Sequence, residues 1–256
     1  MIHATAIVDS DARLDESVHI GPYVVVGPGV DIGAGTRVGA YTVIHGRCRI
    51  GRGNDIHPFC SIGDAPQDKK YQGEDTVLEI GDDNTIREYA TLNRGTVYAQ
   101  KVTRVGDGNY FMAYSHVAHD CIVGNHTVFA NGASLGGHVA VDDHVILGGF
   151  VLVHQFCRVG AHGFCGMGTT ISKDVPPYVM VSGNPGRPRG INLEGLRRRG
   201  FSPASVVHIR RAYRLLYRSG LRLSEAIAVI RAFAAGKPEI GVLLEFLMQT
   251  QRSIVR

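Results

Sequence analysis

The chain has no tryptophan, few cysteines and no long apolar run. Its five cysteines (48, 60, 121, 157 and 165) form no Cys-x-x-Cys pair and leave an odd count, so we expect reduced, structural thiols of a cytoplasmic protein. No window approaches the roughly 18 consecutive apolar residues of a membrane span, so we expect none. The first residues, Met1-Ile-His-Ala-Thr, lack a basic region followed by an apolar run, which predicts no signal peptide.

Glycine is abundant instead, with 33 residues, about twice the average usage. Because glycine permits backbone conformations that other residues avoid, this abundance predicts many tight corners. The missing tryptophan points to a core of small side chains.

Apolar residues recur every six positions through most of the chain up to Ile171. One run steps from Ile2 to Ile62 without a break. A second runs through Val105, Phe111, Val117, Val123, Phe129, Leu135, Val141, Leu147, Val153, Val159, Cys165 and Ile171. A helix would show a period near 3.6 and an ordinary strand a period of two. A repeat of six with one inward aliphatic residue predicts a parallel β-helix, an all-β solenoid of hexapeptide repeats.

Three hexads would make one triangular coil, so residues 18 apart should stack at roughly one strand spacing, ~4.8 Å. Two segments interrupt the repeat, at residues 64–78 and 93–104. The first leaves the phase of six unchanged and the second shifts it by one. Since insertions in a solenoid form surface loops, we expect both segments to project from the scaffold and to carry functional residues.

The period of six ends near residue 185, so we predict a solenoid domain over 1–185 and a helical domain over 186–256. Ser202-Pro203 has the form of a helix start, and Gly220 of its end. Further helices are expected from Ser224 to about Ala235 and after Lys237-Pro238. Residues 1–185 hold 13 basic and 19 acidic residues, net −6, whereas 186–256 hold 14 and 4, net +10. A basic helical domain suits acidic partners or simple solvation.

Histidines gather in the second run of hexads. His119 and His138 are 19 residues apart, and His154 follows 16 later, each about one coil. We therefore expect these three to form a column of imidazoles along one edge. For a single histidine, a solvated surface position would be the ordinary interpretation. Their clustering favours a functional site.

The combined motifs resemble the UDP-N-acetylglucosamine acyltransferase family. They are Gln67-Asp68-Lys69-Lys70-Tyr71, Asn93-Arg94-Gly95-Thr96, His116-Val-Ala-His119-Asp120-Cys121, Gly136-Gly137-His138, Val153-His154-Gln155-Phe156-Cys157 and Asn192 to Gly200. The resemblance covers essentially the whole chain. It implies a left-handed parallel β-helix with a C-terminal α-helical domain, assembled as a homotrimer with active sites between neighbouring subunits.

The resemblance implies transfer of an (R)-3-hydroxyacyl group from acyl carrier protein to the 3-hydroxyl of UDP-GlcNAc, the first step of lipid A synthesis. His119 matches the general base, Asp120 its orienting carboxylate and Gly137 the oxyanion N–H donor. A sugar hydroxyl is a poor nucleophile, so a base near neutral pKa is needed. No metal or other cofactor is implied, since the acyl group arrives on the phosphopantetheine of the carrier protein.

The remaining matched positions imply substrate binding. Asp68 and Lys70 match residues that contact the glucosamine, with Gln67 beside them. Other matched positions line the sugar and nucleotide site, and His154 adjoins it; arginine is a natural partner of the diphosphate. These positions are His116, His138, Gln155, Asn192, Glu194, Arg198 and Arg199. We expect no nucleic-acid partner.

Two positions depart from the usual family pattern. Asn93 stands where many members have histidine, which leaves open whether the acylated group is a hydroxyl or an amine. Met167 matches the position that limits the depth of the acyl tunnel, where members with glycine take longer chains. Methionine there predicts a shorter chain, around ten carbons, if its side chain fills the tunnel rather than packing neutrally.

Four alternatives carry different expectations. The later N-acyltransferase of the same pathway has an additional domain before the solenoid, whereas here the repeat begins at Ile2. Coenzyme A-dependent hexapeptide acetyltransferases share the scaffold, but Gln155 together with the motif from Asn192 has no purpose in them. A solenoid carbonic anhydrase would bind metal through three histidines, for example His116, His119 and His138. A non-enzymatic scaffold leaves the histidines without a role.

Overall fold

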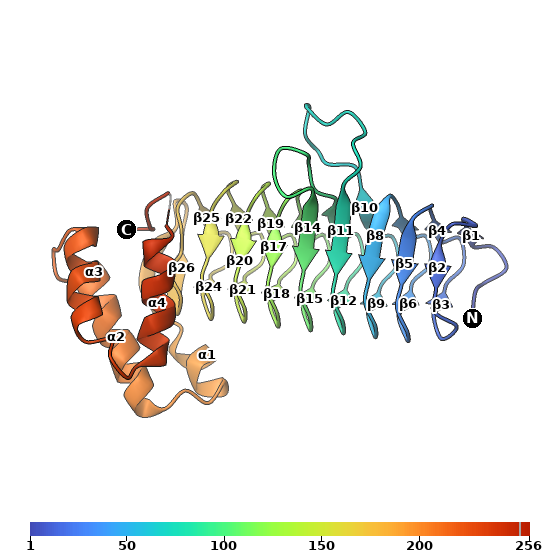
Figure 1. Ribbon diagram of the computed structural model, residues 1–256. Coiled ribbons are helices and arrows are strands. Elements are labelled where there is room, and N and C mark those ends of the chain that lie inside the picture. The colour runs from blue at the N-terminus through green and yellow to red at the C-terminus, as the bar shows by residue number, and fades with distance from the viewer. Residues whose placement is uncertain (251) are drawn as a thin grey trace.

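The computed structural model describes residues 1–250 and 252–256. Figure 1 shows a straight row of short strands with helices at its C-terminal end and two loops projecting from the middle of one edge. The strands belong to three sheets, which form the three faces of a prism. Sheet A has ten strands, sheet B nine and sheet C eight.

Each sheet collects every third strand of the chain. Sheet B contains β1 (Ile7–Val8), β4 (Val25–Val26), β7 (Val43–Ile44), β10 (Ser61–Asp64), β13 (Thr91–Asn93), β16 (His116–Val117), β19 (Ser134–Leu135), β22 (Leu152–Val153) and β25 (Thr170–Ile171). Sheet C contains β2 (Arg13–Leu14), β5 (Val30–Ile32), β8 (Arg47–Ile50), β11 (Val77–Ile80), β14 (Val102–Val105), β17 (Ile122–Val123), β20 (Ala140–Val141) and β23 (Arg158–Val159). Sheet A contains β3 (His19–Ile20), β6 (Arg37–Val38), β9 (Asp55–Ile56), β12 (Thr85–Ile86), β15 (Tyr110–Phe111), β18 (Val128–Phe129), β21 (Ile146–Leu147), β24 (Phe164–Cys165), β26 (Val179–Ser182) and β27 (Arg187–Ile191).

Neighbouring coils stack in parallel, and paired residues are three hexads apart. Ile7 pairs with Val25 near the start, and Ser134 pairs with Leu152 near the histidine-rich motifs. This register confirms the predicted triangular coil. Residues three hexads apart therefore occupy equivalent positions on successive coils, a rule that places most of the site residues discussed below.

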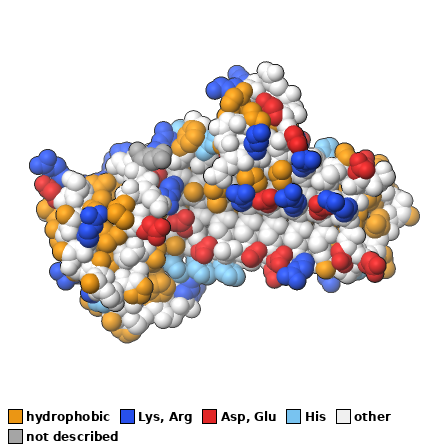
Figure 2. Space-filling view, viewed as in Figure 1, with side chains coloured by type: hydrophobic (Ala, Val, Ile, Leu, Met, Phe, Trp, Pro, Cys, Tyr) orange, Lys and Arg blue, Asp and Glu red, His pale blue; other side chains and the backbone are white. Residues whose placement is uncertain are grey.

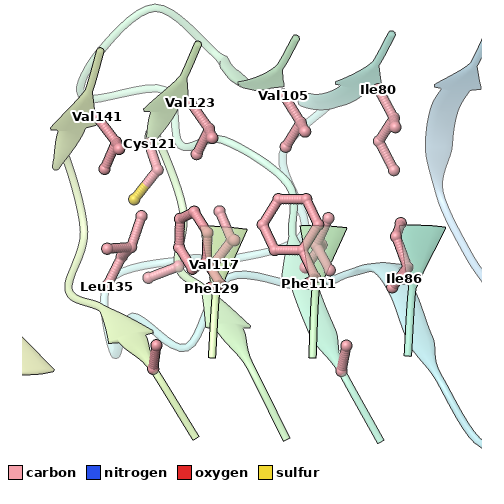
Figure 3. Close-up of a cluster of buried hydrophobic side chains, with 14 of the residues drawn as sticks. Ile80, Ile86, Val105, Phe111, Val117, Cys121, Val123, Phe129, Leu135 and Val141 are labelled. Atoms are coloured by element: carbon pink, nitrogen blue, oxygen red, sulfur yellow. The ribbon is translucent and has the colours of Figure 1, made fainter. Parts of the chain in front are cut away.

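The hexad residues form the core. Every ladder residue from Ile20 to Ile171 is buried, whereas Ile2 is exposed, because the first coil has only one neighbour. Figure 3 shows Phe111 and Phe129 filling the interior between valine and isoleucine side chains. All five cysteines are buried and free, and burial raises the pKa of the Cys121 thiol to about 12. These thiols are structural, as the sequence predicted.

A ladder of buried amides strengthens one corner of the prism. Asn54 Oδ1 accepts from the backbone N–H and from Nδ2 of Asn84, and Asn84 Oδ1 accepts the same pair of bonds from Asn109. Asn109 Oδ1 in turn accepts from the N–H and hydroxyl of Thr127. Each amide oxygen accepts a hydrogen bond from the backbone N–H at the corner of the next coil. The polar groups are therefore buried without losing their hydrogen bonds.

Both interruptions of the repeat leave the solenoid as loops. The irregular parts cover residues 65–76 and 94–101, because β10, β11, β13 and β14 extend into the ends of the predicted segments. The sheets continue across the insertions: Leu92 still pairs with Val117, although the coil between them is lengthened by the second loop. The two loops lie side by side, since Arg94 donates to Tyr71 Oη at 2.8 Å.

The C-terminal segment begins with a strand rather than a helix. Residues 187–191 form β27, which pairs antiparallel with β26. Four helices follow: α1 (Leu193–Arg198), α2 (Pro203–Tyr217), α3 (Leu223–Ala232) and α4 (Pro238–Met248). Ser202 caps α2 by accepting from the Ser205 N–H, as its sequence predicted. α1 was not predicted, because it is only six residues long and has no apolar periodicity of its own.

Charges on the solenoid surface are paired across coils. On sheet C, Arg13 bonds Asp31, and Arg49 and Arg104 both bond Glu79. Figure 2 shows cationic and anionic side chains alternating in a row along the solenoid. Exposed pairs of this kind contribute little to stability, at most ~1 kcal/mol each. Within the described residues, no helix combines the length and apolarity required to cross a membrane.

Candidate active site

A cleft of about 820 Å³ opens between the two loops and one corner of the prism. The corner lies between sheets B and C. The cleft is lined by Gln67, Asp68, Lys69, Lys70, Thr96, Tyr98, Ala99, His119, His138, Gln155 and Phe156. Six of the predicted site residues therefore meet here: Gln67, Asp68, Lys70, His119, His138 and Gln155. The volume is typical of a site for a small organic substrate.

His119 is held by a chain of hydrogen bonds that starts in the second loop. Its Nδ1 lies 2.9 Å from Asp120 Oδ2. Asp120 also accepts from the Thr96 N–H at 2.9 Å and from the Thr96 hydroxyl at 2.7 Å. Because Nδ1 donates to the carboxylate, Nε2 of the neutral imidazole carries the free lone pair. This arrangement is that of an oriented base.

The buried carboxylate of Asp120 stays ionised. Burial by itself would raise the pKa of Asp120, but the hydrogen bonds from His119 and from both groups of Thr96 outweigh it, so the pKa lies below its ordinary value. Asp120 occupies a left-handed corner, with φ of 59°. Its N–H donates to Thr103 Oγ1 at 2.8 Å, which fixes the turn.

Gly137 makes room for the imidazole of His119. It lies three hexads after His119, so it is the equivalent position on the next coil. A Cβ there would come within 2.5 Å of His119 Cε1, a contact that real side chains essentially never make. Within the described residues, the Gly137 N–H has no hydrogen-bond acceptor. A free backbone donor therefore lies directly beside the imidazole.

His138 shares the corner, but the predicted column of imidazoles through His154 is wrong. The His138 ring meets the His119 ring edge to face, with centroids 5.1 Å apart. On the next coil it is Phe156 that stacks on His138, at 4.4 Å. His154 instead stands on the coil position of Gly136, outside the cleft, where Arg252 lies 3.0 Å from its Nδ1. The prediction failed because the step from His138 to His154 is shorter than three hexads.

A true histidine column lies on another edge of the prism. His126, His144 and His162 follow one another at intervals of three hexads and stack with centroids 5.2 and 4.8 Å apart. The stack continues onto Tyr178, and Phe201 meets His162 edge to face. Burial, together with the neighbouring His144, lowers the pKa of His162 to about 4. Sequence reasoning did not single out this column, although its spacing of three hexads was the available signal.

His116 and Asn93 support the site from behind. His116 Nδ1 lies 2.7 Å from Thr91 Oγ1, and burial lowers its pKa. Asn93 is buried, and its Nδ2 donates to the Ala65 carbonyl at 2.9 Å, which ties the start of the second loop to the first. In this chain the residue that departs from the family pattern therefore joins the two loops.

The loop residues present both charges to the cleft. The Lys70 N–H donates to Asp68 Oδ1 at 3.0 Å, which shapes the loop into a turn. Lys70 Nζ lies over the ring of Tyr98, 5.8 Å from its centroid. The Asp68 carboxylate and the Lys70 ammonium can therefore contact a polar ligand beside His119 and His138.

The predicted C-terminal residues do not reach this cleft within one chain. Asn192 caps α1 and donates from Nδ2 to the His162 carbonyl at 2.9 Å. Arg198 pairs with Glu194 along the exposed face of α1. Arg199 lies near His144 and His162, where its charge adds to burial in lowering their pKa values. Asn192 and Arg199 therefore adjoin the histidine column, and Glu194 and Arg198 lie on the exposed helix between them.

Met167 also lies outside the cleft. It is 80% exposed and stands directly before the left-handed Gly168, which turns the chain from sheet A to sheet B. Gly149 occupies the equivalent position on the preceding coil, and a Cβ there would lie 4.0 Å from Met167 Cγ. An exposed methionine of this kind is free to meet a ligand or a second chain.

Sequence reasoning assigned no role to five lining residues of the cleft: Lys69, Thr96, Tyr98, Ala99 and Phe156. Thr96 and Phe156 stood inside quoted motifs, and the signal for Phe156 was its spacing of three hexads from His138. Thr96 could not be found by spacing, because its loop does not follow the repeat. The same holds for Tyr98.

The corner also offers a candidate cation site. One ligand atom from each of His119, Asp120 and His138 lies within 4.8 Å of the others. However, Asp120 Oδ2 already accepts from His119 Nδ1 and from the Thr96 hydroxyl. A metal bound there would displace both hydrogen bonds. The geometry therefore favours proton transfer over metal binding.

Comparison with known proteins agrees with this geometry. The family description "Udp N-acetylglucosamine O-acyltransferase; Domain 2" matches residues 174–255, and the bacterial transferase hexapeptide repeat matches residues 11–46 and 103–137. The acyl-[acyl-carrier-protein]--UDP-N-acetylglucosamine O-acyltransferase of Alkalilimnicola ehrlichii is 57% identical over 255 residues, covering 100% of this chain and 99% of the relative.

Solved structures overlap over the full length. LpxA from Acinetobacter baumannii is 47% identical with a TM-score of 0.98, covering 100% of this chain and 99% of that one. The UDP-N-acetylglucosamine O-acyltransferase of Moraxella catarrhalis is 44% identical with a TM-score of 0.97 at the same coverage. Together with the hexapeptide repeats, this similarity identifies the solenoid as a left-handed parallel β-helix.

Proposed function

Because the chain belongs to the family of UDP-N-acetylglucosamine O-acyltransferases, and is thus an acyltransferase, we propose that it transfers an (R)-3-hydroxyacyl group from acyl carrier protein to the 3-hydroxyl of UDP-GlcNAc, the first step of lipid A synthesis. The observation that carries the proposal is the chain His119, Asp120, Thr96 at the wall of a polar cleft. It supplies the base that a sugar hydroxyl requires.

In the proposed mechanism, His119 Nε2 removes the proton of the 3-hydroxyl as the oxygen attacks the thioester carbonyl. Asp120 stabilises the imidazolium that forms, since its carboxylate is ionised and bonded to Nδ1. A positioned base of this kind contributes roughly 10²–10⁴ in rate. The tetrahedral intermediate then collapses and its C–S bond breaks. The leaving carrier-protein thiolate takes up the proton from His119, which returns the imidazole to its neutral form.

The Gly137 N–H is the proposed oxyanion donor. It lacks an acceptor among the described residues and lies beside the base. A donor already in place stabilises the negative charge of the tetrahedral intermediate without reorganisation. No metal and no cofactor are needed in this scheme, because the acyl group arrives activated as a thioester.

The proposed active form is a homotrimer with sites between subunits. Asn192 and Arg199 adjoin the histidine column, with Glu194 and Arg198 on the helix between them, away from the cleft of the same chain. A second subunit that brings this cluster to the cleft would add arginines for the diphosphate, while Asp68 and Lys70 hold the sugar. His116, His138, His154 and Gln155 complete the binding surface in this proposal. The acidic carrier protein would meet the basic C-terminal domain.

Met167 is proposed to set acyl-chain length. Its exposed side chain stands on a solenoid face that a neighbouring subunit would cover to form the acyl tunnel. Methionine occupies volume that glycine would leave open, so we propose a shorter chain, around ten carbons.

Membership of this family sets aside the N-acyltransferase, coenzyme A acetyltransferase, carbonic anhydrase and scaffold interpretations.

The decisive experiment is mass spectrometry of the product formed from UDP-GlcNAc and a mixed pool of acyl carrier protein thioesters. An O-acylated sugar nucleotide supports the proposal, and acylation only of a 3-amino analogue contradicts it.

His119→Ala should abolish turnover while thermal stability stays near that of the parent protein. Retained turnover would remove His119 from the role of base.

A further inference from the structure

A second cavity lies in the C-terminal domain, between β27 and α2. Its volume is about 440 Å³. Four arginines line it: Arg187 and Arg189 from β27, Arg218 after α2, and Arg256. None of its described lining residues has an acidic side chain. None of them takes part in the proposed acyl transfer.

Two of the four guanidinium groups are partly engaged by the backbone. Arg187 donates to the main-chain oxygen of Arg256, and Arg256 donates to the carbonyls of Leu216 and Leu221. Arg189 uses only Nε, which donates to Ser182 Oγ at 3.0 Å. Arg218 lies beside the Tyr213 hydroxyl and lines the cavity without an acidic partner among the described lining residues. Arg189 and Arg218 therefore retain donors for a ligand.

Two tyrosine hydroxyls in the cavity wall also lack acceptors. Tyr213 is 8% exposed, and its ring centroid lies 4.8 Å from that of Tyr217. Neither buried hydroxyl has an acceptor in the part of the chain that the structure describes, and Arg218 approaches the Tyr213 hydroxyl as a donor. Burial raises the pKa of both, and the nearby Arg218 and Arg256 cations offset this only in part, so both remain protonated donors. Buried donors without acceptors are costly, which indicates that something supplies an acceptor.

We propose that this cavity binds an organic phosphate monoester. The phosphate oxygens would accept from Arg189, Arg218 and the two tyrosine hydroxyls, since guanidinium groups match phosphate geometry. A bare phosphate is far smaller than the cavity, so the ligand carries an organic group. That group would lie against the tyrosine rings and the aliphatic side chains of Leu216 and Leu221.

The test is isothermal titration calorimetry of the full chain with phenyl phosphate, with benzyl alcohol as the uncharged probe. We expect phenyl phosphate to bind and benzyl alcohol not to bind. Arg189→Gln with Arg218→Gln, and Tyr213→Phe with Tyr217→Phe, should each weaken binding about tenfold or more, because each removes hydrogen bonds to a charged group. Arg210→Gln, an exposed arginine on the same helix, is the matched control.

Several outcomes would overturn the inference. One is unchanged affinity in both double variants, provided that these variants melt like the parent protein. Another is loss of binding only in Arg199→Gln, which would place the phosphate near α1. Vesicles of phosphatidylglycerol and of phosphatidylcholine separate a lipid headgroup from a soluble ligand. Binding to the former alone, without binding of phenyl phosphate, would also reject the cavity as a site for soluble phosphates.

Discussion

Thr96 stabilises the ionised form of the Asp120 carboxylate, which in turn holds the imidazole of His119, the proposed base. It donates from both its N–H and its hydroxyl to Asp120. His119 also hydrogen-bonds that carboxylate, and His138 Nδ1 lies 3.9 Å from Oδ2. Asp120 is nearly inaccessible, so water cannot replace a lost bond. Thr96 is thus a positioning residue that acts through Asp120.

We expect Thr96→Val to lower kcat/KM about tenfold at neutral pH, the value of one hydrogen bond to a charged group. The hydroxyl stabilises the ionised form and so lowers the pKa of Asp120. Its removal raises that pKa, and the acid limb of the pH–rate profile shifts to higher pH. The measurement is kcat/KM between pH 4 and 9.

Thr96→Ser is the matched control, since it keeps the hydroxyl. Its pH–rate profile should match that of the parent protein. A purely structural role for Thr96 would lower the melting temperature and leave the acid limb in place. That outcome would contradict the assignment.

The proposed role of Met167 in acyl-chain length gives a second prediction at the residue scale. Met167→Gly should move the preferred acyl donor to longer chains, because the substitution opens tunnel volume that the extra methylenes can fill. Competition among carrier-protein thioesters of graded length measures this directly. Met167→Leu preserves the volume and should keep the parent preference. Best turnover with fourteen carbons in the parent protein, or an unchanged preference in the glycine variant, would reject the assignment.

At the scale of elements, the hexad ladder was fully predictable, whereas the two loops were predictable in position but not in internal structure. A buried aliphatic residue every six positions leaves one solution for the coil, so the core from Ile20 onward followed from the sequence. Helix α2 also followed, from its Ser202 cap and Pro203. The loops obey no period, and their side-chain hydrogen bonds, such as that between Thr96 and Asp120, depend on a fold that spacing alone does not define.

The histidine column links the solenoid to the helical domain. His162 is held neutral by burial, with its pKa lowered to about 4. In the unfolded chain its pKa is near 6.5, so the unfolded state binds more protons between these values. The contribution of the neutral ring to the free energy of unfolding is fully present above about pH 6.5. It decreases as the pH is lowered and is lost by about pH 4.

We therefore expect the urea concentration at the unfolding midpoint to decrease as the pH is lowered from 7 to 4.5. His162→Phe should reduce the slope of this decrease with pH while keeping the stack. His3→Gln, at an exposed position on the first coil, should leave the slope unchanged. Equal slopes in the parent and His162→Phe proteins would show that other groups carry the pH dependence.

At the scale of the whole molecule, the separation between His119 and Arg199 predicts shared active sites. His119 lies at the corner between sheets B and C, whereas Arg199 lies at the histidine column between C and A. If one subunit provides the base and its neighbour the arginine, His119→Ala and Arg199→Gln trimers should each be inactive. Subunits mixed and reassembled in equal amounts should recover about a quarter of parent activity, because that share of interfaces combines two intact halves.

Light scattering must show three chains in each preparation. Mixed trimers that stay inactive would place both residues in the same site of one chain. Activity that survives in Arg199→Gln alone would remove the arginine from the site.

The unbroken stacking of coils also governs how such a gene can change length. A deletion of one residue inside a strand would turn every following inward side chain outward until the next corner. Residues 65–76 and 94–101 lie outside the sheets, so insertions there leave the pairing of Ile62 with Leu92 and of Leu92 with Val117 intact. Lineages of this enzyme should therefore vary in length at these two loops, or by whole coils of three hexads, each of which would move the active corner about 4.8 Å from the helical domain.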